Sequence, residues 1–107
     1  MDASKTLEGL SIVPVVVIED INHAVKLANV LYEAGFAAIE VTLRTSCALS
    51  AIEEIVKNVP EIIVGAGSVR TVEQLSEVGN LGARFAVSPG STQRLIAEAK
   101  RIEMPFV

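Results

Sequence analysis

The sequence has few of the residues that make covalent or metal cross-links. It contains one cysteine, Cys47, so no disulfide can form within the chain, and this favours a reducing compartment, the cytoplasm. Its one histidine, His23, has no cysteine, histidine or carboxylate set around it at metal-ligand spacing. We therefore expect neither a disulfide nor a metal site.

Long apolar runs and clusters of basic charge are also absent. The longest apolar runs, such as residues 12–18, are far shorter than the ~20 residues of a membrane-spanning helix. Residues 1–10 carry charges and lack the apolar run of a signal peptide. The net charge is -4 and the charges are scattered, without the basic stripe that phosphate backbones attract. The sequence thus predicts no membrane partner and no nucleic-acid partner.

The chain does contain enough apolar material for a core. Half of its residues are hydrophobic, and its length fits a single domain, residues 1–107. Short apolar runs rich in β-branched residues alternate with amphipathic stretches, as in parallel strands that are covered on both sides. The predicted strands are residues 13–18, 38–42, 62–65 and 85–88, and a fifth strand begins at residues 105–107.

Each gap between these strands has the three- and four-residue periodicity of a helix. Asp20 is a predicted N-cap, and Gly35 can supply a left-handed stop. Thr71 and Gln74 have the pattern of a capping box. The predicted helices run from Asp20 to Gly35 and over residues 48–56, 71–79 and 95–101. Strands and helices therefore alternate, and right-handed crossovers make the sheet parallel.

Two architectures are compatible with this alternation. A doubly wound sheet of about five strands fits a chain of this length. A (β/α) barrel needs eight units, in a chain of roughly 250 residues. Periodicity alone does not separate the two.

The second predicted strand separates them by its polar residues. Glu40, Thr42 and Arg44 are two residues apart, so they project to one face, while apolar residues alternate with them. A doubly wound sheet would bury Glu40 under a helix layer, at a high cost for an unpaired carboxylate. A barrel instead directs it into the interior near the C-terminal mouth. Glu40 could instead have a purely structural role, in which it pairs with Arg44 or with a neighbouring loop. The spacing of these residues alone does not favour one role over the other.

The third predicted strand is followed by a glycine-rich segment. Gly65-Ala66-Gly67 is, taken alone, most typical of a tight strand-to-helix turn, and it would also let the backbone approach a ligand closely. A dinucleotide-binding fingerprint is excluded, because the position of its third glycine holds Arg70.

Three segments in this order, residues 39–45, 64–69 and 85–90, resemble the 2-keto-3-deoxy-6-phosphogluconate (KDPG) aldolase family, whose members also act as 4-hydroxy-2-oxoglutarate aldolases. Val13-Pro14-Val15 is similar to the family's first strand. The resemblance implies a (β/α) TIM-type barrel, of which this chain would form four βα units and the start of a fifth strand. It also implies a class I aldolase that needs no cofactor, releases pyruvate and an aldehyde, and assembles as a trimer.

The resemblance assigns roles to four residues. Glu40 matches the glutamate that shuttles protons, and Arg44 matches the arginine that binds the carboxylate of the pyruvate portion. Ser68 stands where the family usually has threonine, and it keeps the hydroxyl group that contacts the same carboxylate. Pro89 matches a residue that lines the pocket.

The Schiff-base lysine of the family has no match in this chain, because it lies on a later strand, the sixth. The lysines present fall in the N-terminal arm or in predicted helices: Lys5, Lys26, Lys57 and Lys100. We therefore expect a fragment or truncated product that is inactive alone. Two alternatives stay open: a non-catalytic half-barrel that self-associates, and a doubly wound ligand-binding module.

Overall fold

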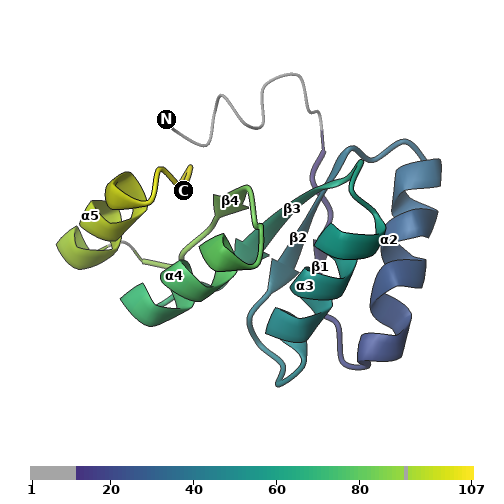
Figure 1. Cartoon of the computed structure of the whole chain (residues 1–107), viewed down its shortest axis with the longest axis horizontal. Coiled ribbons are helices and arrows are strands. Elements are labelled where there is room, and N and C mark those ends of the chain that lie inside the picture. The colour runs from purple at the N-terminus through teal and green to yellow at the C-terminus, as the bar shows by residue number, and fades with distance from the viewer. Residues whose placement is uncertain (1–11, 91) are drawn as a thin grey trace.

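The structure, a computed structural model, describes residues 12–90 and 92–107. Residues 1–10, predicted not to form a signal peptide, and Lys5 within them lie outside this part. The described chain forms one parallel sheet with the strand order β1-β2-β3-β4 (Figure 1). The strands are β1 (Val15–Val16), β2 (Ala38–Thr42), β3 (Ile63–Gly67) and β4 (Phe85–Ala86).

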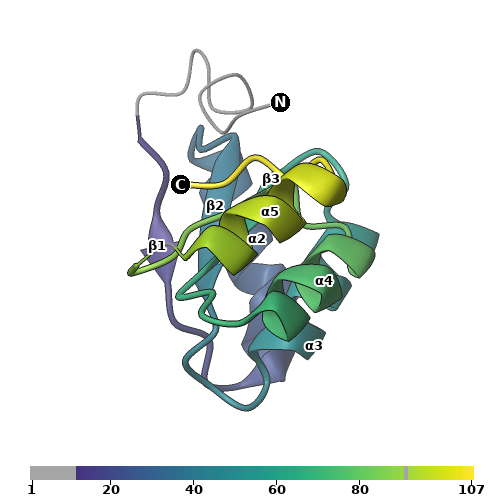
Figure 2. The ribbon, with the colours of Figure 1, turned by 90° about the vertical axis from the view of Figure 1, so that its left-hand side faces the viewer.

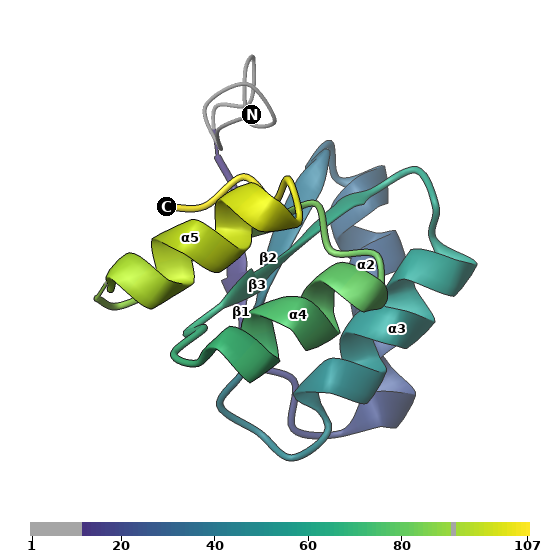
Figure 3. The same cartoon turned by 60° about the vertical axis from the view of Figure 1, so that its left-hand side comes forward.

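The helices also follow one another in sequence. A 3-10 turn, η1 (Ile21–His23), precedes the helices α2 (Ala24–Glu33), α3 (Ala48–Asn58), α4 (Val72–Asn80) and α5 (Gln93–Arg101). Consecutive helices are neighbours, and Figure 3 shows α3, α4 and α5 side by side. The predicted alternation of strands and helices is confirmed.

Local capping explains where several helices begin and end. Asp20 caps η1 by accepting a hydrogen bond from the Asn22 backbone N–H. The capping box of α4 is present, with Thr71 and Gln74 each satisfying the other's backbone N–H. Gly35 has a φ of 104°, the left-handed conformation that ends α2. These predictions from sequence are confirmed.

The helices cover one face of the sheet. In Figure 2, β1 and β2 lie at the left, and α3 and α4 lie at the right. Ile39 and Val41 of β2 point to this side and are fully buried, together with buried residues of all four helices. Burying a large apolar side chain contributes about 1.5–3 kcal/mol, so this single core accounts for most of the stability. A doubly wound sheet carries helices on both faces and a strand order that reverses, so the described topology excludes that alternative.

The opposite face of the sheet, called here the inner face, is covered by no helix of residues 12–90 and 92–107. Val15 of β1 is 61% exposed and Val17 is 48% exposed on this side. The sequence predicts a strand over residues 13–18, but β1 has only two paired residues. It is shorter because side chains such as Val15 and Val17 have nothing to pack against on the inner face.

The fifth strand begins where the sequence predicts. Phe106 forms a parallel bridge with Ala86, and the backbone N–H of Val107 donates to the Ala86 carbonyl oxygen at 2.9 Å. The sheet therefore continues beyond β4 in the same parallel sense. The fifth strand lies next to β4, so the strands of the sheet keep the order in which they occur in the sequence.

The prediction for Gly65-Ala66-Gly67 is wrong. These residues lie within β3, where Gly65 pairs with Glu40 and Phe85, and Gly67 pairs with Thr42. The strand extends two residues beyond the predicted end at residue 65, and the turn starts only at Ser68. Glycine is needed at positions 65 and 67 because side chains of the neighbouring strands occupy the space that a Cβ atom would take on the inner face. The sequence of β3 alone does not reveal these contacts.

Candidate active site

Glu40 lies in the middle of β2 and faces the inner side of the sheet. Its neighbours in register are Val15 on β1 and Gly65 on β3. The carboxylate leans toward the end of β3, where it occupies the space beside Gly67. Partial burial raises the pKa of Glu40 above its ordinary value of 4.5, because burial disfavours the charged form.

Arg44 and Ser68 meet at the C-terminal ends of β2 and β3. The Arg44 Nε donates a hydrogen bond to the Ser68 Oγ at 3.2 Å, across 24 residues of sequence. Ser68 has a φ of 57°, a left-handed conformation that costs a non-glycine residue about 1–2 kcal/mol. Strained backbone of this kind often occurs at functional sites, and here it turns the hydroxyl toward the arginine.

The loop that carries Arg44 is fastened to the end of β1. The Thr45 Oγ1 donates to the Ile18 carbonyl oxygen at 2.6 Å, and the Cys47 Sγ donates to the same oxygen at 3.1 Å. Cys47 is half-buried, and its thiol acts as a hydrogen-bond donor. Sequence reasoning missed this double contact, because its acceptor is a backbone oxygen 27 residues before Thr45.

Pro89 lies in the turn that follows β4 and is exposed. The Ser88 Oγ donates to the Gly90 carbonyl oxygen at 2.6 Å, which closes this turn on itself. The Val69 N–H donates to the Val87 carbonyl oxygen at 3.0 Å, so the turn leaves the sheet next to the Ser68 end of β3. The structure thus brings the loop of Pro89 to the same end of the strands, without a hydrogen bond from it to Arg44 or Glu40.

The lysines of the described residues are all on helices. Lys26 is on α2, Lys57 on α3 and Lys100 on α5, and each is exposed. Within residues 12–90 and 92–107 no lysine stands on a strand or at a strand end.

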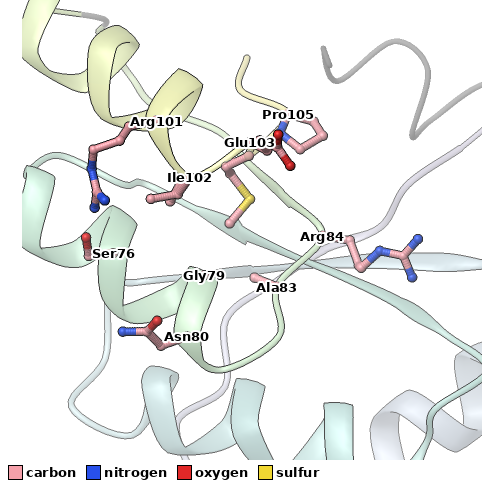
Figure 4. Close-up of a pocket in the computed structure, with 10 residues that line it drawn as sticks. Ser76, Gly79, Asn80, Ala83, Arg84, Arg101, Ile102, Glu103 and Pro105 are labelled. Carbon is pink, nitrogen blue, oxygen red and sulfur yellow. The ribbon is translucent and has the colours of Figure 1, made fainter.

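A cavity of about 520 Å³ lies at the opposite end of the strands (Figure 4). It is lined by the C-terminal ends of α4 and α5 and by residues that precede β4, among them Asn80, Arg84 and Ile102. Arg84 points away from the other polar side chains in Figure 4, so these groups do not converge on one point. This cavity is separate from Glu40 and Arg44.

Among the described residues, no group of three or more histidine, cysteine, aspartate or glutamate side chains could hold a metal ion. None of their helices has the length and apolar character needed to cross a membrane.

Solved structures with high similarity to this chain are KDPG aldolases. The enzyme from Legionella pneumophila, crystallised with pyruvate captured as a covalent carbinolamine intermediate, is 36% identical and superposes with a TM-score of 0.93 over 100% of this chain and 52% of its own. The 2-keto-3-deoxy-6-phospho-gluconate aldolase from Zymomonas mobilis is 39% identical, with a TM-score of 0.92 over the same shares. The sheet is therefore part of a (β/α) TIM-type barrel, and that predicted fold is confirmed.

Sequence comparison identifies the family. The family model for KDPG and KHG aldolase matches residues 3–107, and the chain belongs to this family. The KHG/KDPG aldolase of Escherichia coli K12 is 48% identical over 96 residues, which are 90% of this chain and 45% of that protein. The 2-dehydro-3-deoxy-phosphogluconate aldolase of Dickeya dadantii is 44% identical over 105 residues, 98% of this chain and 49% of that protein. The chain spans about half the length of these curated relatives.

Proposed function

We propose that this chain supplies the proton-transfer and carboxylate-binding part of a class I aldolase. The substrate would be 2-keto-3-deoxy-6-phosphogluconate, 4-hydroxy-2-oxoglutarate or both, and the products would be pyruvate with glyceraldehyde 3-phosphate or glyoxylate. The observation that carries the proposal is the arrangement of Glu40, Arg44 and Ser68 at one end of β2 and β3, on the face without helices. Catalytic groups of (β/α) barrels converge at this end.

Glu40 is suited to move protons in this reaction. Schiff-base formation and carbon–carbon cleavage each require a group that gives and takes protons near neutral pH. Partial burial raises the pKa of Glu40, which brings the carboxyl group closer to that range. We assign it the role of general acid and base.

Arg44 and Ser68 are suited to bind the carboxylate of the pyruvate portion. Their hydrogen bond uses the Nε of Arg44, and no hydrogen bond from the two Nη groups to another described residue competes with the oxygens of a substrate carboxylate. Ser68 orients the guanidinium plane and offers its own hydroxyl group to the same carboxylate. Pro89, in the neighbouring loop, would form part of the pocket wall.

The Schiff-base lysine would come from outside the described residues. We place it on a later strand of the barrel, as the family resemblance implies, and we infer a homotrimer for the parent enzyme. The parent would work in the cytoplasm without a metal or organic cofactor, because the imine itself serves as the electron sink.

The carboxylate-binding role can be tested on the chain itself. Pyruvate added to isotope-labelled chain should shift the NMR signals of Ser68 and of the Arg44 side chain. In Arg44→Ala the shift of the Ser68 signal at the same pyruvate concentration should fall at least about tenfold, because a charge-assisted contact to pyruvate is lost. Arg84→Ala is the matched control, because Arg84 is an exposed arginine at the opposite end of the strands. Equal pyruvate shifts in both variants would contradict the assignment.

The lysine argument has its own test. Borohydride reduction in the presence of pyruvate should leave no covalent adduct on this chain. An adduct on Lys26, Lys57 or Lys100 would overturn the inference that the imine-forming amine is elsewhere.

A further inference from the structure

Gly67, the last residue of β3, leaves on the inner face a space that Glu40 fills. A Cβ atom at Gly67 would lie 2.9 Å from Cδ and 3.1 Å from Cγ of Glu40, and it would overlap the Oε2. Carbon atoms that are not bonded do not approach so closely without displacement. The Glu40 carboxylate therefore packs directly on the backbone of β3.

The backbone conformation of Gly67 does not require glycine. Of the described glycines, only Gly35 and Gly82 have a positive φ. An alanine at position 67 is thus compatible with the local conformation, and space is the reason for glycine there. The atom that competes for this space belongs to Glu40 and to no other residue within the three nearest contacts.

A second glycine limits where the carboxylate could move. The ring of Phe85 occupies the space beside Gly65, two residues earlier on the same face of β3. Phe85 is 1% exposed, so this position is filled. If a methyl group at position 67 displaced the Glu40 carboxylate, the ring would block movement back along β3, and the carboxylate would leave its place on the backbone of β3.

We propose that Gly67 is a positioning residue, which seats the Glu40 carboxylate on β3 beside the Arg44–Ser68 pair. This inference rests on the proposed function of Glu40, and it adds that glycine at this site fixes where the proton is given and taken. A side chain at position 67 would leave the glutamate in the sequence but move its carboxyl group away from the reacting atoms.

The groups that face Glu40 indicate that its carboxylate is held in place by packing and not by an ion pair. On β1 its neighbour in register is Val15, and on β3 the neighbours are the two glycines. Arg44, the charged residue next along the inner face, donates to Ser68. Neither of the two ion pairs among residues 12–90 and 92–107 includes Glu40. Burial alone raises its pKa, so removing the seat should lower that pKa.

The first test is the titration of Glu40 in the full 107-residue chain. The carboxyl carbon signal, assigned by its loss in Glu40→Gln, is followed against pH by NMR in the unaltered chain, in Gly67→Ala and in Gly79→Ala. We expect the pKa of Glu40 to fall toward its ordinary value of 4.5 in Gly67→Ala. Gly79→Ala is the matched control on α4, where a Cβ would meet only the flexible ends of Ile102 and Met104 at 3.3 Å, and the pKa should not change.

A double-mutant cycle keeps the proposal testable if Gly67→Ala folds poorly. Gly67→Ala should change the midpoint of urea unfolding in the unaltered chain at least twice as much as in a Glu40→Ala background, where the competing carboxylate is gone. If Gly67→Ala alone does not fold but the double variant with Glu40→Ala does, this result also supports the proposal.

Three results would overturn the proposal. These are an unchanged pKa of Glu40 in folded Gly67→Ala, an equal change of the unfolding midpoint in both backgrounds, and failure to fold in both. None of these readouts uses catalysis or pyruvate. A negative result for the aldolase activity would therefore leave them unaffected, and the two failures can be distinguished.

Discussion

The two faces of the sheet are built in different ways. On the helix face, buried residues such as Ile39 and Val41 share one core with the residues of four helices. On the inner face, two side chains each pack on a glycine of a neighbouring strand: Phe85 fits over Gly65, and Glu40 fits over Gly67. A substitution on the helix face should therefore disturb the packing of the whole core. A substitution at one of the two glycines of the inner face should disturb the one side chain that packs on it.

The largest expected effect is on the helix face. Leu75 is fully buried in the core between α4 and the sheet. Leu75→Ala should lower the free energy of unfolding by about 2–5 kcal/mol, because it removes apolar contacts and leaves a cavity. Urea unfolding monitored by circular dichroism measures the loss.

The matched truncation on the inner face is Val15→Ala. Val15 is 61% exposed, so this change should cost less than about 0.5 kcal/mol, apart from a small loss of strand propensity. A similar cost for both variants would show that the inner face is covered in solution, as the self-associating half-barrel requires.

A smaller effect is expected where the ends of β1 and β2 are joined. Thr45→Val keeps the shape of the side chain and removes the hydrogen bond to the Ile18 carbonyl oxygen, at a cost of about 0.5–1.5 kcal/mol. The control is Ser46→Ala, an exposed position in the same loop. If the Thr45→Val variant also loses pyruvate-induced shifts at Arg44, the loop contact positions the arginine. Equal stability of the two variants would contradict a role for Thr45 in holding the loop.

The smallest expected effects are those of pH on stability. The carboxylate of Glu98, on the helix side, and that of Glu40, on the inner face, should change stability with opposite sign as the pH rises. Hydrogen bonds from Arg101 and then Ser76 lower the pKa of Glu98 to about 2, so its contribution to stability is present above 4.5 and lost as the pH falls toward 2. The pKa of Glu40 is raised, so its contribution is present below 4.5 and lost as the pH rises through the folded-state value.

These signs predict opposite results for two isosteric changes. At pH 7, Glu98→Gln should lower the midpoint of urea unfolding and Glu40→Gln should raise it, and both differences should shrink at pH 2. A loss of stability in Glu40→Gln at pH 7 would mean that the carboxylate is stabilised by a partner on the inner face.

The helix face could be predicted from sequence because its signals are local. Periodicity and capping residues such as Asp20 and Thr71 lie within one element, so they correctly indicated where the elements lie and in which order. The alternation of Glu40 with Ile39 and Val41 also assigned the two faces of β2 correctly. The barrel was preferred to the doubly wound sheet on that one carboxylate and on the family resemblance.

The inner face could not be predicted in the same way, because its contacts join different strands. The match of Gly67 with Glu40 depends on the register of β2 against β3, which no pattern within either strand specifies. The same is true of the Ser68 conformation and of the Ile18 oxygen that binds both Thr45 and Cys47. For this reason the pattern of Gly65-Ala66-Gly67, read along one strand, predicts a turn where the structure has the end of β3.

The most direct test of the account is a chimera in which this chain replaces the matching 45% of the KHG/KDPG aldolase of Escherichia coli. We expect the folded chimera to cleave 2-keto-3-deoxy-6-phosphogluconate, and Glu40→Gln to reduce kcat by about 10²–10⁴-fold, since the acid and base would be lost. A folded chimera without activity, or one in which Glu40→Gln leaves kcat unchanged, would contradict the assignment of Glu40 as the proton-transfer group.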